Sequence, residues 1–365
     1  MSIYIHIPFC KTICSYCDFP KIIYNKNLVN KYLKALKKEV TSKYKGELIK
    51  TIYIGGGTPS SLNINQLKYL FSIIKIFKLA KKYEFTFECN IDDLNINKIK
   101  LLYQNKVNRL SIGVQTFNKE FLKLLNRNHN YLKTKRTIDN CKRIGFNNIN
   151  IDLIYAIPNE KTNDLKKDLA LFLKLEVNHI STYSLMIEQH TVLYINKTKE
   201  IDEELDYKMY KEIIKTLKNN HFIHYETSNF AKKGYESKHN LIYWNNKHYY
   251  GFGAGASGYI DNIRYDNTKS VFSYINNKYI MSSNTLKKEE IIENEFILGF
   301  RKIKGINKKD FFNKYNINIK DINIIKTLLN ENKLKENKNN IYINKKYLYL
   351  SNTILTRIIG EICLN

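Results

Sequence analysis

Residues 3–19 read IYIHIPFCKTICSYCDF and join a short β-prone run directly to three cysteines, Cys10, Cys14 and Cys17. Half of the six cysteines in this 365-residue chain therefore lie within eight positions. Three thiolates in one loop can hold a [4Fe–4S] cluster, a cube of four irons, and would leave one iron open for another ligand. Structural zinc usually takes four ligands from paired Cys/His clusters, and no second cluster follows at zinc-finger spacing. The loop predicts an iron–sulfur site; zinc and unligated thiols are the alternatives.

Outward from this loop, strand-like runs alternate with helical stretches. The strand-like runs are residues 3–7, 51–54, 84–88, 109–114, 148–153 and 179–185. The helical stretches are residues 27–43, 65–79, 95–104, 118–125, 132–144 and 164–175. Strands that alternate with helices form a parallel sheet with right-handed crossovers. The pattern predicts an α/β fold whose six-stranded sheet is either curved into a barrel or open.

Three of these strands carry polar residues at equivalent places. Alternation with a period of two puts Glu88, Gln115 and Asp152 on the less apolar face of their strands, each at the C-terminal end. In a βα barrel the C-terminal strand ends form the mouth of the active site. A loop start or a helix cap would explain any one of these residues, but together they predict a cavity lined with polar groups.

The composition is that of an ordinary globular chain. Hydrophobic residues make up 43% and charged residues 26% of the chain, which excludes a mostly disordered protein. No run of about 18 uninterrupted apolar residues is present, so no transmembrane helix is expected. The first ten residues lack the basic region and the cleavage site of a secretory signal. We therefore expect a cytoplasmic, reducing compartment, in which clustered thiols indicate metal rather than disulfides.

The chain is strongly basic, with a formal net charge of +26. The lysines are spread along the whole sequence rather than gathered in one stripe, and no RNA-binding motif is present. This distribution favours a compositional bias toward Lys, Asn and Ile over a specific nucleic-acid partner. The basic surface would permit a peripheral contact with an anionic membrane. A basic polyanion-binding module with a vestigial iron site is kept as an alternative.

The pattern changes near residue 201. A charged helix over residues 203–219 precedes an aromatic, glycine-containing stretch over residues 225–259. A Lys/Asn-rich region follows, for which the sequence predicts helices over 289–300 and 321–330, a solvated loop over 331–339 and a strand over 340–350. We predict three parts: residues 1–200, residues 201–280, and a small α-rich domain over residues 281–365, for which a winged-helix-like arrangement is one option.

The cysteine spacing resembles that of the radical S-adenosylmethionine (SAM) superfamily. The resemblance implies that the amino and carboxylate groups of SAM chelate the open iron, and that one electron from the cluster cleaves SAM to a 5′-deoxyadenosyl radical. It also implies a partial (β/α)6 barrel, in agreement with the six strand-like runs. The segment GGGTPS at residues 55–60 lies in the second βα loop, where glycines let the backbone approach a ligand closely. A tight strand-to-helix turn would equally explain that glycine run.

The resemblance also implies which residues contact SAM. Gly56, Gly57 and Thr58 correspond to the segment that binds the amino group. Arg127 would pair with the carboxylate through its planar guanidinium, and Asp152 would hold the ribose hydroxyls. The full set of expected SAM contacts is Tyr4, Gly56, Gly57, Thr58, Glu88, Gln115, Arg127 and Asp152.

Within the superfamily, the chain resembles the branch shared by oxygen-independent coproporphyrinogen III dehydrogenases and HemW-type haem chaperones. The strings that carry this resemblance include YIGGGTPS, RLSIGVQTF, IDLIYAIP and HNLIYWNNKHYYGFGAGASGY. Phe19 stands where the dehydrogenases have a further cysteine, and Cys10 leaves no room for their N-terminal extension. The string HNLIYW at residues 239–244 matches a pattern associated with haem in the chaperones, which makes His239, Asn240, Tyr243 and Trp244 haem candidates. Alternatively, His239 caps a helix and Trp244 fills a gap in the core.

The resemblance implies a haem chaperone that carries one [4Fe–4S] cluster, binds SAM and haem, and passes haem to an acceptor protein. Oxygen-independent oxidative decarboxylation of coproporphyrinogen III is the alternative, so the resemblance leaves open whether the protein is an enzyme. The sequence identifies neither the acceptor protein nor the electron donor.

Overall fold

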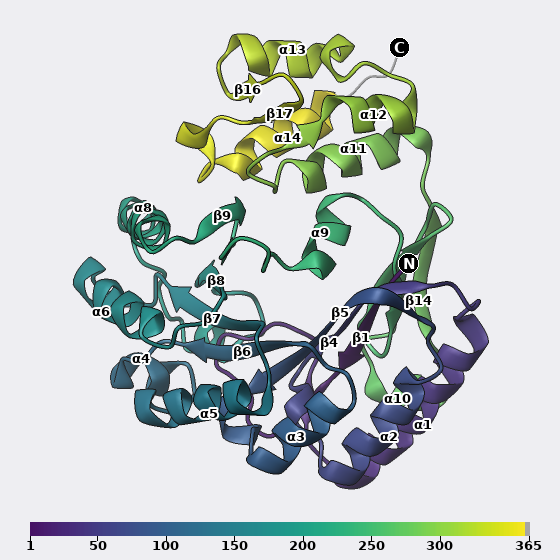
Figure 1. The fold of residues 1–365 in the computed structure, drawn as a ribbon. Coiled ribbons are helices and arrows are strands. Elements are labelled where there is room, and N and C mark those ends of the chain that lie inside the picture. Colours follow the sequence, from purple (N-terminus) through teal and green to yellow (C-terminus); the bar gives the residue numbers. More distant parts are fainter. Residues whose placement is uncertain (362–365) are drawn as a thin grey trace.

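A nine-stranded sheet forms the centre of the computed structural model, which describes residues 1–361 (Figure 1). The strand order is β11-β1-β4-β5-β6-β7-β8-β10-β9, so β11 and β9 are the two edges and the sheet does not close on itself. The six central strands are β1 (Ser2–Ile7), β4 (Ile49–Gly56), β5 (Leu79–Asn90), β6 (Arg109–Gln115), β7 (Ile149–Tyr155) and β8 (His179–Ser184). Neighbours among them all pair in parallel. The predicted α/β fold with six parallel strands in a partial-barrel arrangement is confirmed, and three further strands extend the sheet to nine.

The edges of the sheet come from the second half of the chain. β11 (Tyr250–Phe252) pairs in parallel with β1. At the other edge, β10 (Asn229–Ala231) runs antiparallel to β8, and β9 (Ile223–Glu226) runs antiparallel to β10. The segment after residue 201 therefore completes the sheet at both ends.

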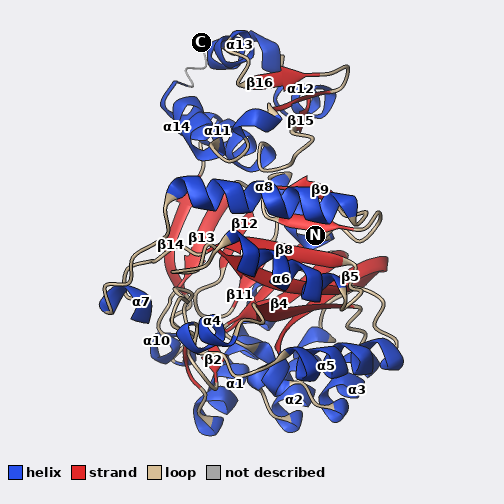
Figure 2. Cartoon of the chain, turned by 90° about the vertical axis from the view of Figure 1, so that its left-hand side faces the viewer, coloured by secondary structure: helices blue, strands red, loops and turns tan. Residues whose placement is uncertain are grey.

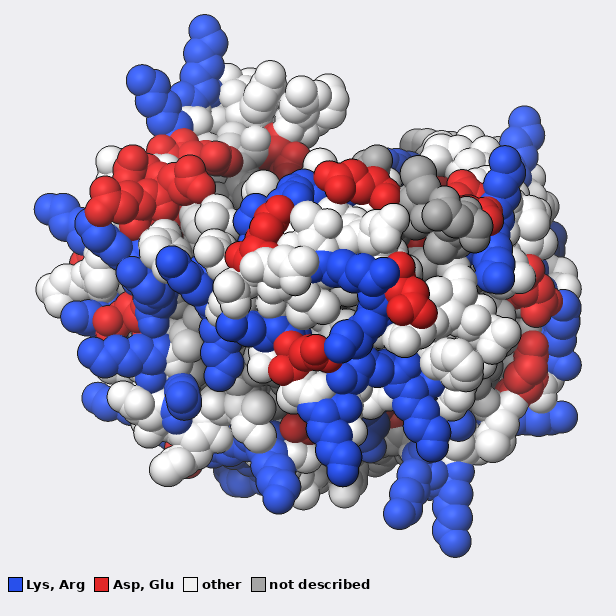
Figure 3. All heavy atoms as spheres, turned by 90° about the horizontal axis from the view of Figure 1, so that it is seen from above, with Lys and Arg blue, Asp and Glu red and all other residues white. Residues whose placement is uncertain are grey.

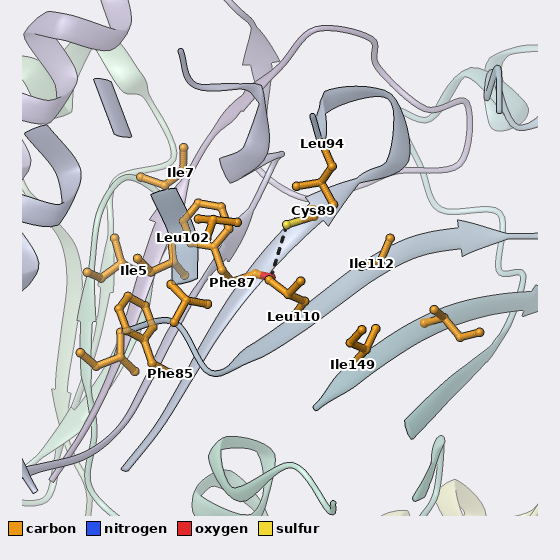
Figure 4. Packing of buried hydrophobic residues seen from close by; sticks show 14 of the residues in the cluster. Ile5, Ile7, Phe85, Phe87, Cys89, Leu94, Leu102, Leu110, Ile112 and Ile149 are labelled. Carbon is orange, nitrogen blue, oxygen red and sulfur yellow. Dashed lines mark hydrogen bonds between the residues drawn. The ribbon is translucent and has the colours of Figure 1, made fainter. Parts of the chain in front are cut away.

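Helices that connect the parallel strands cover one face of the sheet (Figure 1). They are α1 (Lys26–Lys43), α2 (Ile64–Ile74), α3 (Ile96–Gln104), α4 (Lys119–Leu124), α5 (Tyr131–Ile144) and α6 (Thr162–Leu173), with short 3-10 turns at Pro59–Ser61 and Ile91–Asp93. Alternate side chains of the strands pack against these helices. Phe87 of β5 and Ile112 of β6 are fully buried in this layer, and Leu102 of α3 is nearly so (Figure 4). Removing this apolar surface from water is the main stabilising contribution to the layer.

The helix predicted over residues 65–79 is too long. In the structure α2 ends at Ile74, and Leu79 already pairs with Ile49 at the start of β5. The apolar residues between them continue the helical pattern, but residues 75–78 must form the turn that returns the chain to the sheet.

The opposite face of the sheet carries α9 (Lys238–Trp244), which contacts β4 (Figure 1).

The helix α8 (Glu203–Asn219) runs between the sheet and the C-terminal helices (Figure 2). Tyr207 and Tyr210 of α8 contact Tyr349 of the C-terminal part, with ring centroids 5.0 and 5.8 Å apart. The helix thus bridges the two parts.

The C-terminal part has a hydrophobic cluster of its own, which runs from Ile292 to Ile358. It is built from α11 (Lys288–Gly299), α12 (Lys308–Tyr315), α13 (Asn323–Asn330), α14 (Ser351–Glu361) and a sheet of order β15 (Ile306–Asn307), β17 (Asn340–Ile343), β16 (Leu334–Glu336), with 3-10 turns at Ile319–Asp321 and Lys345–Tyr347. The loop predicted over residues 331–339 is wrong in part, because Leu334 is buried and opens β16. The strand predicted over 340–350 ends at Ile343. The division into three parts stays a prediction.

The remaining elements connect these units. They are β2 (Phe9–Cys10), β3 (Ile22–Ile23), α7 (Val192–Ile195), β12 (Ser257–Ile260), β13 (Ile263–Asn267), α10 (Val271–Ile275) and β14 (Ile280–Thr285).

Within residues 1–361, no helix combines the length and the apolar character needed to cross a membrane. On the face shown in Figure 3, lysines and arginines are scattered among acidic side chains rather than gathered in one stripe.

Candidate functional site

The cysteine loop follows β1 and is closed at its base by a short pair of strands. β2 and β3 pair in parallel, so that Phe9 lies opposite Ile22 and Cys10 opposite Ile23. Cys10 is buried, whereas Cys14 and Cys17 are half-buried. The backbone N–H of Cys17 donates to the carbonyl of Cys14 at 3.3 Å, which folds the loop back on itself.

All three cysteines line one cavity of about 500 Å³, together with residues at the C-terminal ends of the central strands. Among residues 1–361, however, no group of three Cys, His, Asp or Glu side chains is already drawn together around one metal position. The predicted site residues that line the cavity are Cys10, Cys14, Cys17, Gly56, Gly57, Thr58, Glu88, Gln115, Arg127, Asp152 and Asn240. The sequence positions predicted separately therefore converge on one place.

The glycine loop after β4 packs directly against the cysteine loop. A Cβ atom on Gly57 would lie 2.9 Å from the Pro8 carbonyl carbon and 3.0 Å from the Cys10 sulfur. Gly56 has a φ of +115°, a conformation that side chains with a Cβ rarely adopt. The Thr58 hydroxyl lies 3.3 Å from the Cys10 sulfur. Glycine is thus needed here because backbone and sulfur approach each other closely.

Glu88 holds the glycine loop from the next strand. Its carboxylate accepts a hydrogen bond from the Tyr53 hydroxyl at 2.6 Å and another from the Gly56 N–H at 3.1 Å. Burial raises the pKa of Glu88 to about 7, even though both hydrogen bonds oppose the shift. Asp152 lies on β7 and accepts from the Asn150 amide at 2.8 Å, and burial raises its pKa as well.

Three residues at the cavity have a buried polar atom with no hydrogen-bond partner among the described residues. These atoms are Oε1 of Gln115, Nε of Arg127 and Nε of Arg109. The Arg127 guanidinium is held in place by the Asn90 side-chain oxygen at 2.7 Å and the Tyr16 hydroxyl at 3.5 Å. Buried polar atoms are rarely left unpaired, so an unpaired acceptor and an unpaired donor beside the cysteine loop fit a polar, charged ligand such as SAM. Three cavity-facing thiols likewise fit a cluster held by three cysteines.

Tyr4 does not line the cavity. Its hydroxyl lies 3.0 Å from Nδ1 of His6, and its ring stands behind that of Tyr53 with centroids 6.1 Å apart. Tyr53, rather than Tyr4, donates a hydrogen bond to the carboxylate of Glu88. The predicted contact of Tyr4 with SAM stays a prediction.

The segment HNLIYW forms α9, whose first turn is held by the sheet. The Ser237 hydroxyl accepts from the Asn240 N–H, and the Glu84 carboxylate accepts from the N–H groups of Lys238 and His239 at 3.0 and 2.9 Å. A carboxylate at a helix N-terminus satisfies N–H groups that have no partner within the helix. The helix is therefore fixed to β5 at this end.

His239 is an internal residue of this arrangement. Its ring is 1% exposed, with Nδ1 2.8 Å from the Thr51 hydroxyl and Nε2 2.8 Å from the Tyr243 hydroxyl. Burial lowers the pKa of His239 to about 3, so the ring is neutral near pH 7. Both ring nitrogens are engaged, and coordination of an iron would have to break one of these contacts. Among the haem candidates, Asn240 alone lines the cavity. The Trp244 ring packs against Arg301 instead, whose guanidinium carbon lies 5.4 Å from the centroid of that ring.

Several polar residues that line the cavity deeper along the same strands were not predicted from the sequence. They include Arg109, Ser111, Asn150 and Ser181. Arg109 and Ser111 precede Gln115 on the same strand face, as Asn150 precedes Asp152. The period-two alternation would have identified them if it had been followed along the whole strand instead of only at its C-terminal end.

Comparisons with known proteins show which family and which fold this chain shares. The model of the radical SAM superfamily matches residues 4–172. Heme chaperone HemW of Lactococcus lactis is 39% identical over 98% of this chain and 97% of its own length. Heme chaperone HemW of Bacillus subtilis is 38% identical over 99% of this chain and 100% of its own length. The structure of coproporphyrinogen III oxidase (HemN) from Escherichia coli superposes with a TM-score of 0.86 at 20% identity, over 98% of this chain and 89% of that one. This last match shows a shared fold.

Proposed function

The chain belongs to the HemW family of haem chaperones within the radical SAM superfamily, and on that premise we propose that it binds one [4Fe–4S] cluster, SAM and one haem, and passes the haem to an acceptor protein. The observation that supports this most is the single cavity that brings the three cysteines together with the unpaired Gln115 and Arg127 atoms. Thiols alone would fit other metals, but thiols beside a site for a charged ligand fit a cluster with one open iron.

In this proposal Cys10, Cys14 and Cys17 hold the cluster, and together the cluster and SAM supply one-electron chemistry. The protein's own contribution is position and charge. Gly56 and Gly57 let this loop pack against His6 and the cysteine loop, because a Cβ on either residue would clash there. Arg127 presents a preformed guanidinium to the SAM carboxylate, fixed by Asn90 and Tyr16. Glu88, Gln115 and Asp152 add acceptors from three successive strands.

The experiment is anaerobic reconstitution with iron and sulfide, followed by titration with SAM and with haem. We expect about four irons and the visible absorbance of a cubane cluster, one SAM and one haem for each chain, and transfer of that haem to an apo-haemoprotein. Replacement of Cys10, Cys14 and Cys17 by alanine should abolish the cluster. Cys141→Ala is the matched control, because Cys141 is a buried thiol on α5 that does not border the cavity.

Two results would contradict the proposal. Formation of protoporphyrinogen from coproporphyrinogen III, with SAM and a reductant present, would support the decarboxylating enzyme instead. Reconstituted protein that takes up no haem would remove the chaperone function and leave only a SAM-binding iron–sulfur protein.

A further inference from the structure

Arg109, the first residue of β6, is a buried cation for which the described part of the chain provides no partner. The residue is 2% exposed, yet it borders the cavity. Its Nε is shielded from solvent without a hydrogen-bond partner, and in residues 1–361 no carboxylate lies within 4.0 Å of its guanidinium. A buried, unpaired charge is costly, and arginine is most often buried together with a carboxylate or phosphate.

The side chains of β7 and β8 near Arg109 are already committed to other groups. The Asn150 side-chain oxygen accepts from His179 at 2.6 Å and from the Ser181 hydroxyl at 3.1 Å. Its amide donates to the Ser111 hydroxyl and to Asp152, each at 2.8 Å. On the other side, Thr86 of β5 lies opposite Arg109, and its buried hydroxyl has no hydrogen-bond partner in residues 1–361 either.

The nearby carboxylates are engaged as well. Both oxygens of Glu84 accept from the first turn of α9, and both oxygens of Glu88 hold Tyr53 and Gly56. The positive charge of Arg109 also helps to lower the pKa of His179 and of His239, after the larger effect of burial, so these two imidazoles stay neutral beside it. Burial raises the pKa of Glu88 and of Asp152, and the charge of Arg109 opposes both shifts. In residues 1–361, however, no carboxylate forms a direct ion pair with Arg109.

Arg109 is separate from the group proposed to bind the SAM carboxylate. Arg127 lies over Gly113 of β6, where an added Cβ would be 2.7 Å from its Nη2, and it contacts Tyr16 of the cysteine loop. Arg109 precedes Gly113 by four residues, which corresponds to about 13 Å along a strand. The two arginines therefore line the cavity at different positions, and the one beside the cysteine loop is the one proposed to bind the SAM carboxylate.

We propose that Arg109 binds a carboxylate of the haem cargo, namely a propionate, through its guanidinium. This inference rests on the proposed haem function and extends it by naming the group that recognises the cargo. Haem is a flat, apolar disc with two carboxylates at one edge. The same cavity offers apolar side chains for the disc, since Phe19 and Met186 line it and are 62% and 64% exposed. A guanidinium can bind a carboxylate with two parallel hydrogen bonds, which would give the buried charge its missing partner.

The test is a double-mutant cycle in which the second change is made on the ligand. Reconstituted wild-type protein and Arg109→Gln are each titrated with haem and with haem dimethyl ester, in which both propionates are uncharged. We expect Arg109→Gln to weaken haem binding about tenfold or more. The ester should bind wild type more weakly by a similar factor, and Arg109→Gln should not weaken ester binding further. Arg136→Gln, which removes an exposed guanidinium on α5, is the matched control and should bind both haem and its ester with wild-type affinity.

Each outcome separates this inference from the proposed function. If wild type binds no haem, the proposed function fails. If wild type binds haem and its ester equally, and Arg109→Gln changes neither affinity, only the role of Arg109 is overturned. If Arg109→Gln loses SAM and keeps haem, the carboxylate is that of SAM and the proposal is wrong. The ester arm uses the wild-type protein, so it gives an answer even if Arg109→Gln does not fold.

Discussion

The hydroxyl of Thr51 on β4 lies 2.8 Å from Nδ1 of His239 on α9, which joins residues 188 positions apart in the sequence. The other ring nitrogen contacts Tyr243 one turn later on the same helix. His239 thus attaches α9 to the sheet. The first residue of the HNLIYW segment is therefore a structural contact, and the next residue, Asn240, lines the cavity.

We therefore predict that His239→Ala lowers stability more than it lowers direct ligand affinity. Loss of two buried hydrogen bonds and of the ring should reduce the free energy of unfolding by about 2–4 kcal/mol. His239→Asn, whose amide can still reach Thr51, should recover part of that loss. Urea unfolding monitored by circular dichroism measures the effect, with the exposed His221→Ala as control. A large loss of haem affinity in a variant of unchanged stability would show instead that His239 binds the iron.

Gly57 provides a steric test of the cluster loop. Gly57→Ala places a methyl group 2.9 Å from the Pro8 carbonyl carbon and 3.0 Å from the Cys10 sulfur, so backbone or sulfur must shift. We expect a reduced iron content after reconstitution and a loss of stability of about 1–3 kcal/mol. Gly234→Ala is the control, because no atom lies within 4 Å of its added Cβ and only the strain of its positive φ is incurred. Normal iron loading of Gly57→Ala would show that the two loops are not tightly packed.

The fold could be predicted because each crossover unit repeats the same local pattern. Apolar residues such as Leu110 and Ile112 alternate with polar ones along a strand, and each strand is followed by an amphipathic helix. The C-terminal ends of parallel strands share one side of a sheet, so the alternation was enough to assign Glu88, Gln115 and Asp152 to one cavity. Those positions depend on local pattern and strand direction alone.

The residues that could not be placed depend on long-range contacts instead. The burial of His239 results from its packing against Thr51 and under Tyr243, and no local pattern encodes the first of these contacts. Alternation along β6 puts Arg109 on the cavity face, but only the three-dimensional structure shows that its Nε is buried without a partner in residues 1–361. The end of α2 was misplaced because the apolar pattern continues through a turn.

Arg127 provides a direct test of the proposed SAM site. Its unpaired Nε and its contacts to Asn90 and Tyr16 leave the guanidinium preformed for a carboxylate. Arg127→Gln should weaken SAM binding about tenfold or more, measured by anaerobic calorimetry. Arg127→Lys should restore little of the affinity, because an ammonium group cannot form the paired hydrogen bonds. Unchanged SAM affinity in Arg127→Gln, with Arg136→Gln as reference, would exclude this role.

Glu160 should make the stability of the protein depend on pH. The side chain is 1% exposed and accepts from the Ile157 N–H at 3.0 Å, and burial raises its pKa to about 8 from an ordinary 4.5. A carboxyl group whose pKa is raised by folding stabilises the folded state fully below pH 4.5. Its contribution is lost as the pH rises toward 8, at up to about 1.4 kcal/mol per pH unit.

Glu160→Gln should remove this loss, because an amide does not ionise but can still accept from Ile157. The free energy of unfolding of Glu160→Gln minus that of wild type should therefore increase from pH 5 to pH 8. Urea unfolding at pH 5, 6, 7 and 8 measures it, and Glu289→Gln, which replaces an exposed carboxylate on α11, should give a difference independent of pH. A constant difference for Glu160→Gln as well would mean that Glu160 is ionised in the folded protein, and that its unpaired oxygen is then satisfied by water.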